Sequence, residues 1–181
     1  MSRAPVYTRD GDDGTTGLFY GGRVAKDSVL PRAYGMVDEA QAVLGVVRAE
    51  AGAGSEVESL LIPLMRDLWV LMTELATLPE NRSKLEPGKT CVEPSMVTRL
   101  ETVIDDLSAR FDPPTEFVVP GGNLVAAWLD VARTVVRRAE VQSLAAAPPP
   151  SQVVPYLNRL SDLLWTMARW QEGTSLAVRS V

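Results

Sequence analysis

Five of the thirteen glycines in this 181-residue chain lie within residues 8–26, a stretch that also carries hydroxyl groups and cations. Glycine admits positive φ angles and lets backbone N–H groups converge on an anion. The stretch therefore has the composition of a phosphate cradle, whose candidate members are Gly11, Gly14, Gly17, Thr8, Thr15, Thr16, Arg9, Arg23 and Lys26. A solvated, turn-rich N-terminus is the alternative, and glycine content alone does not decide between the two.

A second group of polar residues lies on a predicted helix that includes residues 129–140. At about 100° per residue, Arg133, Arg137 and Glu140 share one polar stripe. Two arginines four residues apart repel each other, whereas a bound polyphosphate turns the repulsion into attraction through charge-assisted hydrogen bonds. The alternative is pairing within the helix, in which Asp130 reaches Arg133 and Arg137 reaches Glu140.

Two other predicted helices add polar residues beside apolar faces. Asn158 and Asp162 share a face, and the Asn158 amide is suited either to reading a nucleobase edge or to satisfying a backbone carbonyl in the core. Asp38 lies one step from a predicted buried face and is a plausible partner for Arg133 across the bundle. Exposure at the surface would make Asp38 inert.

Composition excludes several kinds of chemistry. The chain has no histidine and a single cysteine, Cys91, which rules out a zinc centre, a histidine-activated nucleophile and an intrachain disulfide. We expect Cys91 to be a passive thiol. A net charge of -5 argues against nucleic acid as a partner. Without an apolar signal region or a membrane-length apolar run, we expect a cytoplasmic protein.

Hydrophobic periodicity predicts five helices, no strands and a single domain over residues 1–181. The first helix carries Tyr34 to Val47 and ends at Gly52, and the others have approximate ranges of 55–78, 93–110, 123–146 and 151–172. Residues 79–92 read as a polar connection, and residues 117–122 as a short apolar segment closed by a turn. The last residues, 173–181, are expected to fray. The fold class is therefore an all-α helical bundle.

Six motifs in this sequence resemble, in their order, those of the PduO-type ATP:cob(I)alamin adenosyltransferases. They span nearly the whole chain, at residues 7–17 (YTRDGDDGTTG), 23–26 (RVAK), 33–39 (AYGMVDE), 117–122 (FVVPGG), 132–140 (ARTVVRRAE) and 156–162 (YLNRLSD). The resemblance implies a ferritin-like five-helix bundle that assembles as a homotrimer with ATP at each subunit interface. Residues 1–32 would be the ATP-binding segment, residues 33–172 the bundle and residues 173–181 the tail.

The resemblance also implies the nucleotide site. One protomer would hold the triphosphate through Thr8, Arg9, Asp10, Gly11, Gly14, Thr15, Thr16, Gly17 and Lys26. The neighbouring protomer would complete the site with Arg137, Arg138, Glu140 and Asn158. Magnesium would be carried on the phosphates, with no metal site on the protein itself.

In the family that the chain resembles, Co(I) of a reduced corrinoid attacks C5′ of ATP, and triphosphate leaves. By resemblance, Phe117 displaces the lower axial ligand of cobalt, while Asp38 and Arg133 form a salt bridge on the corrin side. A cob(II)alamin reductase and an adenosylcobalamin-dependent mutase are possible partners. No histidine or thiol is required for this reaction.

The chain departs from the family pattern on the corrin side. Asp130 stands where the family usually has histidine, Ala40 and Gln41 where it has leucine and asparagine, and Val141 where arginine is common. Asp130 therefore competes with Asp38 for Arg133. Two rival hypotheses remain: a nucleotide or adenosylcobalamin carrier of the same fold with little turnover, and a purely structural helical module.

Overall fold

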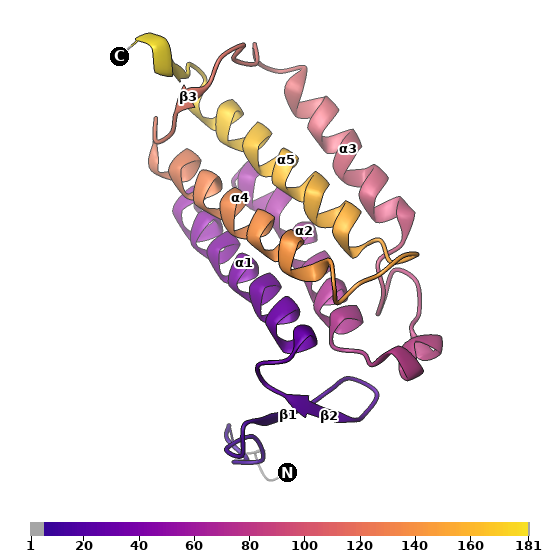
Figure 1. The fold of residues 1–181 in the computed structure, drawn as a ribbon. Helices are drawn as coiled ribbons and strands as arrows, with labels where there is room; N and C mark the ends of the chain where they lie inside the picture. Colours follow the sequence, from indigo (N-terminus) through magenta and orange to yellow (C-terminus); the bar gives the residue numbers. More distant parts are fainter. Residues whose placement is uncertain (1–5, 181) are drawn as a thin grey trace.

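Five α-helices make up most of the chain in a computed structural model that describes residues 6–180 (Figure 1). They are α1 (Val29–Ala51), α2 (Glu56–Leu75), α3 (Pro94–Ser108), α4 (Leu124–Ser143) and α5 (Val153–Glu172). The helical fold class predicted from periodicity is confirmed. Two short 3₁₀ helices, η1 (Pro79–Lys84) and η2 (Val178–Ser180), complete the helical content, and η1 lies in the connection that was expected to have no helix.

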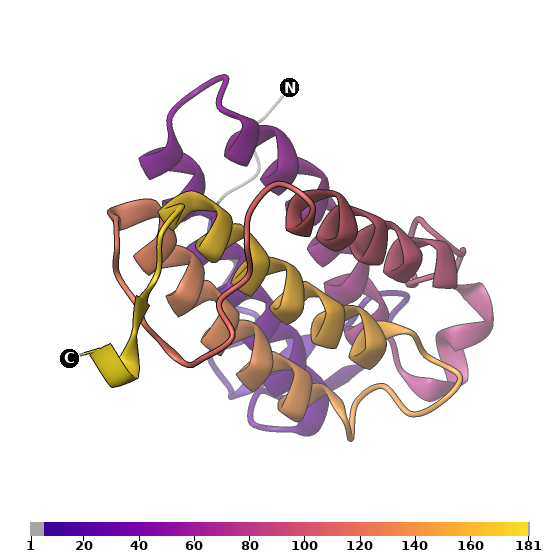
Figure 2. The ribbon, with the colours of Figure 1, turned by 90° about the horizontal axis from the view of Figure 1, so that it is seen from above.

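The helices lie side by side with α4 between α1 and α5 (Figures 1 and 2). Helix α2 packs on α1, and α3 packs on α5. Each helix turns one apolar stripe inward, as the spacing of its leucines predicts. The leucines with no exposed surface are Leu44, Leu61, Leu68, Leu71, Leu75, Leu100, Leu129, Leu157, Leu160, Leu163 and Leu164.

One polar group inside the bundle is shared by three helices. The Tyr156 hydroxyl on α5 donates to Asp67 Oδ2 on α2 at 2.8 Å, and Arg99 on α3 forms an ion pair with the same oxygen. Burial raises the pKa of Tyr156 well above its ordinary value, so the phenol stays protonated and keeps donating. These two contacts link α2, α3 and α5, and they give the Asp67 Oδ2 atom hydrogen-bond partners inside the bundle.

The glycine-rich segment is a β-hairpin, contrary to the expectation of a chain without strands. Strand β1 (Thr15–Gly17) pairs antiparallel with β2 (Arg23–Ala25), with Thr15 opposite Ala25. The Phe19 N–H donates to the Ala76 carbonyl at 2.9 Å, which fastens the hairpin to the end of α2. Strands of three residues are too short to show an alternating apolar pattern, so periodicity did not reveal them.

Residues 176–180 form regular secondary structure, where a frayed end was expected. Strand β4 (Leu176–Ala177) pairs antiparallel with β3 (Val118–Val119), in the segment that was expected to be a turn-closed apolar stretch. The expectation of a frayed tail was wrong because the tail pairs with residues 118–119, which are too distant in the sequence for a local pattern to reveal the pairing. Within residues 6–180, no helix combines the length and the apolar character that crossing a bilayer demands.

We predict that Asn123→Ala lowers the free energy of unfolding by about 1 kcal/mol. Asn123 caps α4, because its Oδ1 accepts from Ala126 N at 2.9 Å, while its Nδ2 donates to the Gln171 carbonyl at 2.8 Å. Denaturant unfolding measures the loss. Ser28→Ala is the matched control, since Ser28 stands at the N-cap of α1 without a side-chain capping bond and its hydroxyl donates only to the exposed Ala25 carbonyl, outside the helix. Equal losses in the two variants would contradict the assignment.

Candidate functional site

The hairpin segment closes over Gly11. A Cβ atom added at Gly11 would lie 3.0 Å from Lys26 Nζ and 3.1 Å from the Thr15 carbonyl oxygen. The Lys26 N–H in turn donates to the Gly14 carbonyl at 2.9 Å, and Gly14 has a φ of 82°. The structure thus brings together Gly11, Gly14, Thr15 and Lys26 in a compact loop with an ammonium group above a glycine backbone, which is suited to holding an anion.

Arg23 braces this loop internally. Its Nη2 donates to Thr15 Oγ1 at 2.7 Å and also to the Asp10 carbonyl, and it lies 3.8 Å from Asp13 Oδ1. Asp13 Oδ1 accepts from the Thr15 hydroxyl at 2.7 Å, and hydrogen bonds from Thr15 hold the pKa of Asp13 below its ordinary value. The sequence identified Arg23 as a countercharge for a ligand, whereas in the protomer its guanidinium stiffens the loop.

The other residues expected in the N-terminal part of the site lie on the same loop. Thr8 Oγ1 accepts from Asp10 N at 3.3 Å, and Thr16 Oγ1 donates to the Gly17 carbonyl at 3.4 Å. Arg9 has a φ of 67°, a left-handed conformation that non-glycine residues seldom adopt. The backbone of the loop is therefore held in a special conformation at the position where the resemblance expects a phosphate contact.

A second polar surface lies where α4 packs on α5. Arg137 Nη1 donates to Ser161 Oγ at 3.3 Å, and Asn158 Nδ2 donates to Glu140 Oε1 at 2.9 Å. Sequence reasoning placed Arg137, Glu140 and Asn158 in one site, and the structure brings them side by side. The alternative pairing of Arg137 with Glu140 is not formed, because Glu140 is turned toward α5.

Arg138 lies elsewhere. Its Nη2 is 2.6 Å from Glu39 Oε1 on α1, so Arg138 lies at the contact of α1 with α4 rather than at the contact of α4 with α5. Over the part of the chain that the structure describes, no hydrogen bond or ion pair joins residues 8–26 to Arg137, Arg138, Glu140 or Asn158. The two halves of the expected nucleotide site are thus separate in one protomer.

A cavity of about 650 Å³ lies next to Phe117. The loop before β3, the helices α4 and α5, and the C-terminal segment surround it. Its lining residues are Pro114, Thr115, Glu116, Phe117, Val118, Pro120, Asp130, Arg133, Trp165, Arg169, Val178 and Arg179. Phe117 is 90% exposed and lies at the edge of this cavity. A mixture of aromatic, apolar and charged walls suits a large ligand with both apolar and polar groups.

The expected contact between Asp38 and Arg133 is not formed in the protomer. Arg133 Nε lies 3.3 Å from Asp130 Oδ1, three residues earlier on the same helix, and Asp38 is exposed on α1. Asp130 takes Arg133 because an i, i+3 pair on one helix needs no approach between helices. The pairing of Asp130 with Arg133, kept open as the alternative above, is confirmed.

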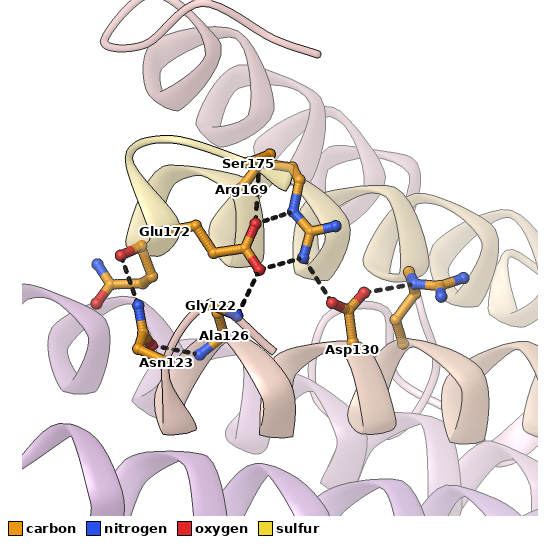
Figure 3. Close-up of polar contacts among 9 residues, drawn as sticks. Gly122, Asn123, Ala126, Asp130, Arg169, Glu172 and Ser175 are labelled. Atoms are coloured by element: carbon orange, nitrogen blue, oxygen red, sulfur yellow. Dashed lines mark hydrogen bonds and ion pairs between the residues drawn. The ribbon is translucent and has the colours of Figure 1, made fainter. Parts of the chain in front are cut away.

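A buried charge cluster, which sequence reasoning missed, stands behind this pair (Figure 3). Arg169 is only 1% exposed, and its Nη2 donates to Asp130 Oδ2 at 2.5 Å and to Glu172 Oε1 at 3.2 Å. Arg169 Nε lies 3.1 Å from Glu172 Oε2, an ion-pair distance without hydrogen-bond geometry. The sequence did contain a signal for this cluster: Arg169 falls on the apolar side of its helix, and a buried arginine requires an acidic partner.

Glu172 extends the cluster to two loops. Its side chain accepts from Gly122 N at 3.2 Å and from Ser175 Oγ at 3.0 Å. The cluster formed by Asp130, Arg169 and Glu172 therefore links Arg133 to the segment after β3 and to the start of the C-terminal tail. Cys91 lies outside this region, and burial raises the pKa of its thiol, which favours a passive role.

Comparisons with known proteins agree with the motifs. The family model described as cobalamin adenosyltransferase matches residues 6–171. A corrinoid adenosyltransferase of Citrobacter freundii is 40% identical over 172 residues, which cover 93% of this chain and 96% of the relative. One from Mycobacterium tuberculosis is 40% identical over 169 residues, which cover 91% of this chain and 86% of the relative.

Solved structures resemble the fold as well. A variant of the PduO-type ATP:corrinoid adenosyltransferase from Lactobacillus reuteri, complexed with cobalamin and ATP, superposes with a TM-score of 0.85. It is 28% identical to this chain, and the match covers 97% of each chain. A second variant of this enzyme from that organism, complexed with ATP, has a TM-score of 0.82 at 27% identity. The match covers 96% of this chain and 100% of the other.

We predict that Asp130→Asn lowers the free energy of unfolding by about 3 kcal/mol, because Arg169 would keep its buried charge and lose one of its two carboxylates. Denaturant unfolding measures this change. Glu101→Gln is the control: Glu101 pairs with Arg159 at 3.3 Å at an exposed site, where less than about 1 kcal/mol is expected. A loss of that small size at Asp130 would show that the buried cluster contributes little to stability.

Proposed function

The chain belongs to the cobalamin adenosyltransferase family, and from this premise we propose that it transfers the 5′-deoxyadenosyl group of ATP to the cobalt of a reduced corrinoid. The products are adenosylcobalamin and triphosphate. The observation that carries the proposal is the extent of the match: the matched region, residues 6–171, contains the hairpin loop, the polar residues between α4 and α5, and Phe117 together. ATP and the corrinoid are both substrates.

The hairpin loop is proposed to hold the triphosphate of ATP. Its support is the small space above Gly11, which the Lys26 ammonium closes and which a side chain would fill. Backbone N–H groups, hydroxyls and Lys26 are the donors that phosphate oxygens need. Magnesium would be bound by the phosphates. The loop members of this site are Thr8, Arg9, Asp10, Gly11, Gly14, Thr15, Thr16, Gly17 and Lys26.

Arg137, Glu140 and Asn158 are proposed to complete the nucleotide site from a neighbouring subunit. The support is that these residues and the hairpin loop carry complementary parts of one site yet have no bond to each other within a protomer. Arg138 is the least supported member, because Glu39 already holds it. A second subunit is the simplest source of the missing half.

A homotrimer is the proposed assembly, and two exposed apolar patches support it. One lies on α4, where Leu124, Trp128 and Val131 are 63%, 36% and 42% exposed. The other is centred on Trp69, which is 67% exposed and lies beside a cavity of about 320 Å³ between α1 and α2. Ile62 and Met65 line this cavity together with the polar residues Gln41, Arg48 and Arg66. A three-membered ring requires two different surfaces on each subunit, because its interface is head-to-tail. We propose that the α4 patch of one subunit meets the α1/α2 patch of the next.

The cavity beside Phe117 is proposed to receive the corrinoid. The exposed Phe117 ring could occupy the lower face of the cobalt and keep the axial base away. Arg133 would present its guanidinium to the corrin amides, with Asp130 in the anchoring role that the resemblance assigned to Asp38. This division leaves cobalt reactivity to the corrinoid itself and gives the protein the tasks of orientation and water exclusion.

The group transfer requires no nucleophile from the protein. The electron pair of Co(I) forms the bond to C5′ of ATP, and the bond from C5′ to the triphosphate oxygen breaks with its electrons on the leaving group. Cations around the triphosphate stabilise the charge that develops there. The reaction consumes reduced corrinoid, so a cob(II)alamin reductase is the proposed supplier, and an adenosylcobalamin-dependent mutase is a proposed acceptor in the cytoplasm.

We predict that the protein converts chemically reduced cob(I)alamin and MgATP into adenosylcobalamin, which visible absorbance detects. Arg137→Ala is expected to raise the KM for ATP about 10- to 100-fold, because one charge-assisted contact to phosphate is lost. Arg110→Ala removes an exposed arginine paired with Glu56 on the other side of the bundle and should leave the KM unchanged. ATP binding without triphosphate release in the wild type would instead identify a carrier.

We predict a trimer by light scattering or sedimentation at saturating MgATP. Trp128→Asp and Trp69→Asp each place a charge in one of the two proposed interface patches, so both should shift the mass toward the monomer and reduce activity. Thr102→Asp on the exposed side of α3 is the control and should leave the trimer intact. A wild-type protein that stays monomeric when saturated with ATP would contradict the shared nucleotide site.

A further inference from the structure

The ring of Phe117 has almost no packing of its own. Its side chain is 90% exposed, so neighbouring side chains do not determine where the ring points. The segment before it is irregular, and only β3, two residues long, follows it. The direction of the ring therefore depends on what holds the backbone at residues 117–119.

The C-terminal segment, residues 174–180, provides that hold. The Val178 N–H donates to the Phe117 carbonyl at 2.8 Å, and strand β4 pairs Ala177 with Val118 and Leu176 with Val119. Val178 and Arg179 line the same cavity as Phe117. Figure 2 shows the yellow tail running alongside the segment that carries β3.

Glu172 fastens both members of this strand pair (Figure 3). Its side chain is 1% exposed and accepts from Gly122 N, after β3, and from Ser175 Oγ, before β4. The fit is close, since a Cβ atom added at Gly122 would lie 2.9 Å from Glu172 Cγ. Arg169 neutralises the carboxylate, so burial of Glu172 is stabilised by an ion pair.

We propose that residues 174–180, fastened by Glu172, position the aromatic ring of Phe117 for displacement of the axial ligand of the corrinoid. The segment is a positioning element and makes no bond to the reacting atoms. The inference rests on the proposed function and deepens it. The segment also lies outside residues 6–171, which the family model matches.

Residues 174–180 contribute no buried side chain to the core, so their role can be tested by removing them. None of residues 174–180 is buried, and α5 ends with its own cap, where Gly173 N donates to the Arg169 carbonyl at 3.2 Å. A chain that ends after Gly173 keeps Arg169, Glu172 and this cap. We therefore expect the truncated protein to fold with a far-ultraviolet spectrum and helix content like those of the full chain.

The decisive experiment compares two starting states of the corrinoid. Cob(I)alamin already lacks its lower ligand, whereas cob(II)alamin must lose it before reduction, so only the second route needs the ring. Ending the chain after Gly173 also removes Val178 and Arg179 from the cavity wall, so the rate from cob(I)alamin serves as the reference for each variant. We expect the ratio of the rate from cob(II)alamin, with a chemical reductant, to the rate from cob(I)alamin to fall about tenfold in this truncated chain, as in Phe117→Ala.

A double-mutant cycle tests whether the segment acts through Phe117. The truncation combined with Phe117→Ala should lower the ratio of the cob(II)alamin rate to the cob(I)alamin rate no further than the more affected single variant, because both remove the same positioned ring. Multiplicative losses, or an equal loss from both starting states, would overturn the inference. Wild-type turnover from cob(I)alamin tests the proposed function separately, so failure of one does not count as failure of the other.

A point substitution gives an independent readout. Ser175→Ala removes one bond to Glu172, while Thr174→Ala removes a neighbouring exposed hydroxyl that bonds to no described side chain. Hydrogen exchange of residues 114–122 should become faster in Ser175→Ala and in the truncated chain, and stay unchanged in Thr174→Ala. Unchanged exchange in the truncated chain would show that the segment does not hold the Phe117 backbone, and would overturn the inference.

Discussion

The buried guanidinium of Arg169 is the interaction on which the cavity end of the molecule depends. It lies between the carboxylates of Asp130 and Glu172, and each carboxylate has a further partner outside the core. A buried cation without its acids would be expensive, so the three side chains must stay together. Their partners are consequently held too: Arg133 on α4, the backbone after β3, and the tail after α5.

The same contact explains how a helical bundle presents an exposed aromatic ring in a defined place. The bundle itself is rigid because its helices share a continuous leucine core, but its loops have little apolar surface to bury. A strand pair of two residues has too few hydrogen bonds to be stable alone. Because the segments next to both strands bond to the buried carboxylate of Glu172 on α5, the wall of the cavity is held in a fixed position relative to that helix.

The nucleotide side of the molecule is arranged differently. Its loop is preorganised by short-range bonds among Asp10, Asp13, Thr15 and Arg23, and it extends from the end of the bundle (Figure 1). Arg137, the cation that faces α5, belongs to a separate surface. In the proposed assembly a second subunit would bring the loop and this helix face together, and ATP binding would then favour association. The absence of histidine is no obstacle to chemistry in which cobalt is the nucleophile.

The sequence alone determined the helical class, the approximate bounds of the five helices and the family, and it predicted that Arg137, Glu140 and Asn158 lie close together. Apolar spacing and motif order are local properties of a chain, so they can be read directly. Tertiary structure decided that Arg133 pairs with Asp130, that Arg138 faces α1, that Arg169 is buried, and that the tail forms β4. Each of these contacts depends on which helix faces or chain segments meet when the bundle closes, and short strands or single charges carry no periodic signal of that choice.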